Sequence, residues 1–114
     1  MRPRRFEVWL ADLNPRMGTE SGKTRPVVIV QTDLLNEIHP STVVCPVTTK
    51  VNADLNILRV HIRKGGLDKP SDVMVDHLRA IDNRRLLTRV GALTKEQSEA
   101  LTSNLKIVLD LQSP

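Results

Sequence analysis

The apolar positions of the first 93 residues recur with the spacing of short β-strands. Residues 6–13 alternate Phe6, Val8 and Leu10 with Trp9, Ala11 and Leu13, and this pattern, apolar on both faces, predicts an inner strand. Turn-forming residues separate further apolar runs, which predict strands over 27–31, 43–48, 55–62, 71–82 and 89–93. Five or six short strands with close turns predict a small, partly open antiparallel β-barrel of the SH3 kind.

Three intervening regions carry other signals. Residues 16–24 contain two glycines, small polar residues and charges of both signs, which is typical of a functional loop. Residues 32–42 read as a plain connection, and residues 83–87 as a single helical turn. In the strand over 55–62 we expect Ile57 to face inward, and Arg59, His61 and Arg63 to face outward.

The period becomes helical after residue 93. Thr94 and Gln97 form a capping-box pattern, and Leu101, Leu105 and Val108 follow at helical spacing. This predicts a helix over about 94–111 that plugs the barrel or packs against the sheet. We therefore expect one mainly β domain over residues 1–114, with the barrel over about 5–93 and a C-terminal α-helix.

The amino-acid composition limits the kinds of molecule that the protein is expected to bind. The 114 residues carry a net charge of +4, which fits either a polyanionic partner or a merely basic surface. Aromatic residues make up only 2%, which argues against a platform that stacks on bases. The lone Cys45 lies in an apolar run and predicts a buried thiol in a disulfide-free, cytoplasmic protein. Neither a signal peptide nor a membrane-spanning run is indicated.

The sequence lacks metal-ligand spacing, a phosphate-binding glycine loop and a nucleophile elbow, so metal and nucleotide cofactors are disfavoured. Polar residues instead gather at predicted strand ends and on the long loop, where one edge of a barrel can bring them together: Glu20, Lys23, Thr24, Arg25, Thr48, Thr49, Asp76, His77 and Arg79. Each also has a structural interpretation: a surface ion pair for Arg25, β-propensity for the threonines, and an Asp76–Arg79 salt bridge. For any one residue alone, that interpretation is the stronger.

Several segments together resemble one family across nearly the whole chain. These are Glu7–Pro15, Gly18–Glu20, Thr24–Gln31, Pro46–Thr49, Arg79–Asp82 and Val90–Leu93. In this order and spacing they are similar to the MazF/PemK/Kid family of bacterial toxin endoribonucleases. The resemblance implies an SH3-like barrel, a homodimer and metal-independent, sequence-specific cleavage of single-stranded RNA. It also implies inhibition by a small acidic MazE/PemI-like antitoxin, with operator DNA contacted only through the toxin–antitoxin complex.

Carried over residue by residue, the resemblance makes Arg25 and Thr48 catalytic, with Asp76 beside the substrate groove as a third candidate. Glu20 matches a loop acid that affects activity in some members. Lys23, Thr24, Thr49, His77 and Arg79 are the expected substrate-binding residues. His77 stands where relatives carry Gln. It could read a base edge, act as an acid or base, or be a plain polar strand residue, and the last interpretation is the strongest. Lys50 after the Thr pair and the short segment 51–59 depart from the family pattern.

The chemistry of the family suits these residue types. RNA carries its own nucleophile, the 2′-OH, so a protein needs a base, a donor for the charged phosphorane and an acid for the leaving oxygen. A guanidinium and a hydroxyl can stabilise the phosphorane, and a carboxylate suits the base better than an always protonated Arg. Two alternatives remain open: a CcdB-like toxin that poisons gyrase without cutting, and a basic RNA-binding module.

Overall fold

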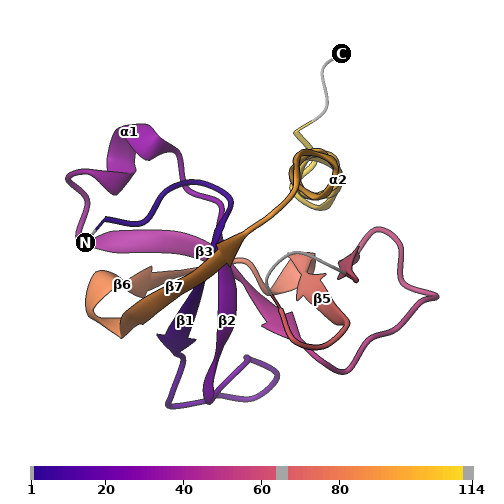
Figure 1. Ribbon diagram of the computed structural model, residues 1–114, viewed down its shortest axis with the longest axis horizontal. Helices are drawn as coiled ribbons and strands as arrows, with labels where there is room; N and C mark the ends of the chain where they lie inside the picture. Colours follow the sequence, from indigo (N-terminus) through magenta and orange to yellow (C-terminus); the bar gives the residue numbers. More distant parts are fainter. Residues whose placement is uncertain (1, 64–66, 112–114) are drawn as a thin grey trace.

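One antiparallel sheet with a helix packed on it builds the protein (Figure 1). The computed structural model describes residues 2–63 and 67–111. Its elements in chain order are β1 Glu7–Asp12, β2 Thr24–Ile29, α1 Asp33–Asn36, β3 Ser41–Thr48, β4 Arg59–Ile62, β5 Ser71–Met74, the 3₁₀ turn η1 Val75–His77, β6 Arg79–Asp82, the 3₁₀ turn η2 Asn83–Arg85, β7 Leu86–Ala92 and α2 Lys95–Val108. Among the described residues the strand order is β4-β5-β3-β2-β1-β7, with β6 also on β3, so the sheet is not closed.

The central strand β3 organises the sheet. It pairs with β2 along one edge, while β6 and β5 share the other edge. Val47 lies opposite Val73 and Val44 opposite Arg79, so three steps along β3 correspond to six steps in the partner. The extra residues of this segment form η1, which is not part of the β-ladder. The prediction of a single strand over 71–82 is therefore wrong, because this range forms two strands joined by η1.

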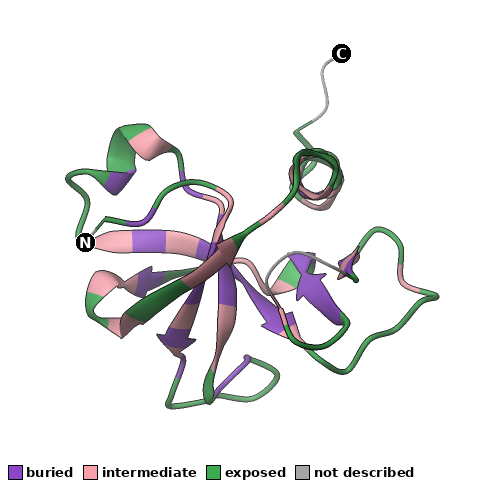
Figure 2. Ribbon diagram, viewed as in Figure 1, coloured by how far each residue is buried: buried purple, intermediate pink, exposed green. Residues whose placement is uncertain are grey.

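Two apolar clusters lie on the two faces of the sheet, and successive residues of a strand pack alternately into one cluster and the other. Val8 of β1 and Val28 of β2 enter the first, whereas Trp9 and Val27 enter the second. This confirms that β1 is an inner strand. Buried positions follow the strands through the centre of the ribbon (Figure 2).

Helix α2 covers the first cluster through Leu101, which is fully buried, and through Leu105 and Val108. The capping box at its start is confirmed: Thr94 accepts from the Gln97 N–H, and the Gln97 side chain accepts from the Thr94 N–H. The helix ends at Val108, three residues before the expected end. No helix in the described part of the chain is both long and apolar enough to cross a membrane.

Other expectations fail for local reasons. The connection 32–42 contains helix α1, which Thr32 caps by accepting the Leu34 N–H. Strand β4 begins only at Arg59, because residues 52–55 fold into a turn in which the Asn52 side chain accepts the Asp54 N–H. Ile57, expected to face inward, is therefore half exposed at 50%. The turn expected at 83–87 is confirmed as η2, but it ends at Arg85, because the last strand begins at Leu86 rather than at the expected residue 89.

Candidate functional site

Arg25 and Thr48 meet at one edge of the sheet. Because β2 and β3 are antiparallel, the start of β2 adjoins the end of β3, and the register of Val27 opposite Pro46 continues toward this pair. Both residues line a groove of about 710 Å³. The groove also includes Glu20, Lys23, Thr24, Thr49 and Lys50. The structure thus brings six of the nine sequence-predicted site residues into one hollow.

The guanidinium of Arg25 forms one hydrogen bond within the described part of the protein, through Nε, and its two terminal nitrogens remain available. Its Nε donates to the Gly22 carbonyl at 3.0 Å. Its terminal nitrogens have no hydrogen-bond partner among the described residues, and no carboxylate there pairs with them, so a surface ion pair does not explain Arg25. Burial, and secondly the positive charge of Arg16, lower the pKa of Arg25, but a guanidinium stays protonated at neutral pH. This fork is suited to bind an anion.

The hydroxyl of Thr48 is prepared as a donor. The backbone N–H of Lys50 donates to Thr48 Oγ1 at 3.1 Å. Because that bond uses a lone pair of Oγ1, the hydroxyl proton remains available for another acceptor. An anion seated on Arg25 would meet this proton in the same groove.

The loop between β1 and β2 forms the groove wall and is tightly built. Gly22 passes so close to Arg16 that an added Cβ would lie 2.6 Å from the Arg16 Cβ, which explains the glycine. Lys23 adopts a φ of 65° and its N–H donates to the Asn14 side chain at 2.8 Å. The close approach at Gly22 and the hydrogen bond of Lys23 therefore fix the conformation of the loop backbone next to Arg25.

A second, smaller hollow of about 240 Å³ lies behind the same loop. It is lined by Glu20, Ser21, Asp76, His77 and Arg79 among others. Asp76 and His77 belong to η1 rather than to a continuous strand, and Asp76 is exposed. Glu20 lines both hollows, whereas Asp76 lines only this one. Within residues 2–63 and 67–111 no salt bridge joins Asp76 to Arg79.

Ser21 connects the loop to η1, and sequence reasoning missed it. Its Oγ lies 3.1 Å from His77 Nδ1, and its carbonyl accepts from Arg79 Nη1 at 3.4 Å. Ser21 is buried at 7% exposure although it lies on a polar loop. His77 therefore links the β1–β2 loop to the η1 turn through Ser21.

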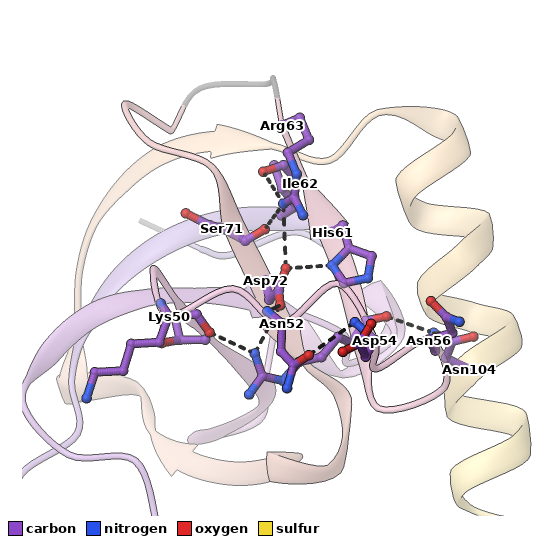
Figure 3. A network of polar contacts seen from close by, with 12 residues as sticks. Lys50, Asn52, Asp54, Asn56, His61, Ile62, Arg63, Ser71, Asp72 and Asn104 are labelled. Atoms are coloured by element: carbon purple, nitrogen blue, oxygen red, sulfur yellow. Dashed lines mark hydrogen bonds and ion pairs between the residues drawn. The ribbon is translucent and has the colours of Figure 1, made fainter.

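Sequence reasoning also missed Asp72, which is fully buried. It accepts hydrogen bonds from the Asn52 N–H at 2.8 Å, His61 Nδ1 at 2.7 Å and Arg59 Nη1 at 3.0 Å (Figure 3). Arg59 and His61, expected to face solvent, face this carboxylate. Burial raises the pKa of Asp72, but these hydrogen bonds and the charge of His61 outweigh it, so the net shift is downward.

Two further groups bear on the chemistry. Cys45 is fully buried, and burial with the nearby charge of Asp76 raises the pKa of its thiol to about 12, so it is the expected core residue. Among residues 2–63 and 67–111, no three His, Cys, Asp or Glu side chains gather in a way that could hold a metal ion.

A basic antiparallel barrel with an Arg–Thr groove suits the binding of an anion, and comparison with known proteins gives its family. Residues 4–109 match the family model described as PemK-like, MazF-like toxin of type II toxin-antitoxin system. The chain is 34% identical to the endoribonuclease MazF of Staphylococcus saprophyticus over 112 residues, which cover 96% of this chain and 93% of the relative. The chain therefore belongs to the PemK-like, MazF-like toxins, as the sequence resemblance implied.

Solved structures agree with this fold. The Mycobacterium tuberculosis toxin MazF-mt6 is 27% identical, with a TM-score of 0.79 over 94% of this chain and 99% of that one. MazF of Deinococcus radiodurans superimposes with a TM-score of 0.83 over 96% and 98% of the two chains, at 22% identity. The expected SH3-like, partly open barrel is confirmed. The named endoribonuclease relative also favours the RNA-cleaving reading over a gyrase poison.

Proposed function

We propose that this chain is the toxin of a type II toxin–antitoxin pair, and that it cuts single-stranded mRNA at particular sequences without a metal ion. The single observation that carries the proposal is the meeting of Arg25 and Thr48 in one groove, with the Arg25 terminal nitrogens and the Thr48 proton both available. Family membership supplies the reaction class, and the groove supplies groups that fit it.

The reaction is a transfer within the RNA. The 2′-oxygen attacks the adjacent phosphorus, the bond from phosphorus to the 5′-oxygen breaks, and the products are a 2′,3′-cyclic phosphate and a 5′-OH. Negative charge develops on the non-bridging oxygens in the transition state. Arg25 and Thr48 donate hydrogen bonds to those oxygens, and donors placed in advance for a developing charge are among the strongest contributors to catalysis.

A proton must leave the 2′-OH and another must reach the 5′-oxygen. Arg25 is permanently charged and cannot take the first. The carboxylates of Glu20 and Asp76 are the candidate bases: Glu20 lies on the loop that walls the groove, and Asp76 lines the smaller hollow beside that loop. His77, with Nδ1 engaged by Ser21, is assigned with Arg79 to holding the loop and the neighbouring nucleotide rather than to proton transfer.

The rest of the groove provides substrate contacts. Lys23, Thr24, Thr49 and Lys50 line it together with Arg25, so cations and hydroxyls border the path of a phosphate backbone. The net charge of +4 favours the encounter with a polyanion. Translation would stop because cut messages cannot be read.

The partners follow from the family. MazE–MazF complexes are known from Deinococcus radiodurans, and a mycobacterial endoribonuclease has been solved with its cognate antitoxin. For this chain we propose an acidic antitoxin of the same type, homodimerisation, contact with operator DNA only within the antitoxin complex, and a cytoplasmic location. We also propose that residues 1–114 act as one toxin domain.

The test is RNA cleavage in EDTA. Incubation of the protein with a long single-stranded RNA in excess EDTA should give discrete fragments. Their 5′ ends should accept phosphate from a polynucleotide kinase without prior dephosphorylation, because they carry 5′-OH groups. Intact RNA under these conditions would overturn the proposal. Supercoiled DNA with gyrase, assayed in parallel, should show no toxin-dependent cleavage complex.

A further inference from the structure

The carboxylate of Asp72 joins segments that border the groove. Its Oδ2 accepts from the Asn52 N–H and from Arg59 Nη1, and its Oδ1 accepts from His61 Nδ1 (Figure 3). Arg63 Nη1 lies 3.6 Å from Oδ1. A fully buried carboxylate needs such partners, since an unpaired buried charge is strongly unfavourable. Every one of these partners comes from residues 52–63, which begin two positions after the groove residue Lys50.

A short chain of contacts runs from this carboxylate to the Thr48 hydroxyl. Arg59 Nη1 donates to Asp72 Oδ2 at 3.0 Å and also to the Lys50 carbonyl at 3.1 Å. The Lys50 N–H in turn donates to Thr48 Oγ1. Asp72 is also the residue directly opposite Thr48 in the β3–β5 ladder, so the two side chains lie on the same face of the sheet.

We propose that Asp72 is a positioning residue for RNA cleavage, which acts through Arg59 and Lys50 on Thr48. By holding residues 50–52 in place, the carboxylate keeps the Lys50 N–H on Thr48 Oγ1. That contact leaves the hydroxyl proton as the free group that donates to the phosphate. The inference rests on the proposed function and adds a residue outside the groove to it.

A purely structural role explains the cluster less well. Apolar packing of similar volume commonly stabilises a buried position as well as a buried ion cluster does. What an apolar residue cannot supply is the fixed direction of three hydrogen bonds toward residues 52, 59 and 61. Those directions determine where residues 50–52 lie relative to Thr48.

The first experiment is a double-mutant cycle on cleavage of a short single-stranded RNA. Asp72→Asn should lower kcat about tenfold and leave KM within about twofold, because it disturbs the donor rather than the binding surface. In a Thr48→Val background, Asp72→Asn should change kcat less than about twofold, because the hydroxyl it positions is gone. Ile81→Val, a core change in the other apolar cluster, is the control for lost stability and should keep wild-type kcat.

Two outcomes of the cycle would overturn the inference: a wild-type kcat for Asp72→Asn, or an equal loss in both backgrounds. The variant Arg59→Gln tests the same chain if Asp72→Asn does not fold. It breaks the link to the Lys50 carbonyl and leaves the carboxylate with Asn52 and His61, so the same non-additivity with Thr48→Val is expected.

Amide hydrogen exchange gives a readout that does not need activity. In the wild type the Lys50 and Asn52 amides should be protected, and Asp72→Asn should speed the exchange of both by about tenfold or more. Thr48→Val should speed only Lys50. Unchanged Lys50 exchange in Asp72→Asn would refute the link to Thr48. A wild type that cuts no RNA would refute the proposed function instead, so the two failures are distinguishable.

Discussion

Replacing Arg25 by Ala should abolish most of the RNA cleavage while leaving the fold intact. The Arg25 side chain enters the groove beside Thr48 and uses only its Nε within the protein, toward the Gly22 carbonyl. The substitution therefore removes the donors intended for the phosphate and one internal hydrogen bond. Because these two losses differ in size, activity and stability should separate.

The magnitude follows from the contacts. A hydrogen bond to a charged group contributes about 1.5–3 kcal/mol. Two bonds from the terminal nitrogens of Arg25 to a phosphorane therefore correspond to about 3–6 kcal/mol, or roughly 10²- to 10⁴-fold in kcat/KM. The lost bond from the charged Arg25 Nε to the Gly22 carbonyl amounts to about 1.5–3 kcal/mol of folding stability on the same scale, which a domain stable by about 5–15 kcal/mol can lose and remain folded. Arg25→Lys keeps the charge but lacks the fork, so we expect it to recover about tenfold.

The assay is the initial rate of cleavage of a fluorescent single-stranded RNA in EDTA, with urea unfolding of each variant measured alongside. Arg84→Ala is the matched control. Arg84 is also an arginine, but it is exposed and pairs with Asp82 away from the groove, so its loss should leave the rate unchanged. A kcat/KM for Arg25→Ala within about threefold of wild type would refute the assignment of Arg25 to the transition state.

Three further outcomes are expected. Because hydrogen bonds depress the pKa of Asp72 in the folded state, its contribution to stability is present above the unfolded pKa and lost as the pH falls through the folded one. Urea unfolding between pH 7 and 3 should therefore show a steeper loss for wild type than for Asp72→Asn. Gly22→Ala should press on the Arg16 Cβ, shift the loop and raise KM several-fold, and equal KM values would contradict the close approach. The Cys45 thiol, buried and with its pKa raised to about 12, should react with iodoacetamide at pH 8 only after unfolding, as followed by mass spectrometry.

The sequence predicted what repeats along the chain. The alternation of apolar residues in β1 and the capping box at Thr94 are local patterns that can be read directly from the sequence. The inner strand and the start of the C-terminal helix were therefore predicted correctly. Arg25 and Thr48 were expected in one site from the family resemblance, and antiparallel pairing of β2 and β3 explains why they meet. Six of the nine expected residues share the groove for that reason.

What failed depends on contacts between distant residues. The break in 71–82 arises because its two halves pair with different ends of β3, a mismatch that only the assembled sheet reveals. The sequence analysis did not single out Asp72, since nothing local shows that Arg59 and His61 will cover it. A usable signal did exist: three basic residues, Arg59, His61 and Arg63, alternate on one face of a short strand, which is unusual unless an acid faces them.

The positions of the two carboxylates indicate which of them acts as the general base, and this can be tested. Glu20 lines the groove of Arg25 and Thr48 as well as the hollow behind the loop, whereas Asp76 lines only the hollow behind the loop. A base must lie within hydrogen-bond reach of the 2′-OH, or be separated from it by one water, so this geometry favours Glu20.

We therefore expect Glu20→Gln to remove the acid limb of the pH profile of kcat, because a carboxylate base works only when ionised. Asp76→Asn should keep that limb and alter KM or the preferred cleavage sequence instead, as a residue that binds the neighbouring nucleotide would. The profiles should be measured in EDTA on one RNA substrate under saturating conditions. Loss of the acid limb in Asp76→Asn with its retention in Glu20→Gln would reverse the assignment, and would require the loop of residues 16–24 to move so that Asp76 reaches the nucleophile.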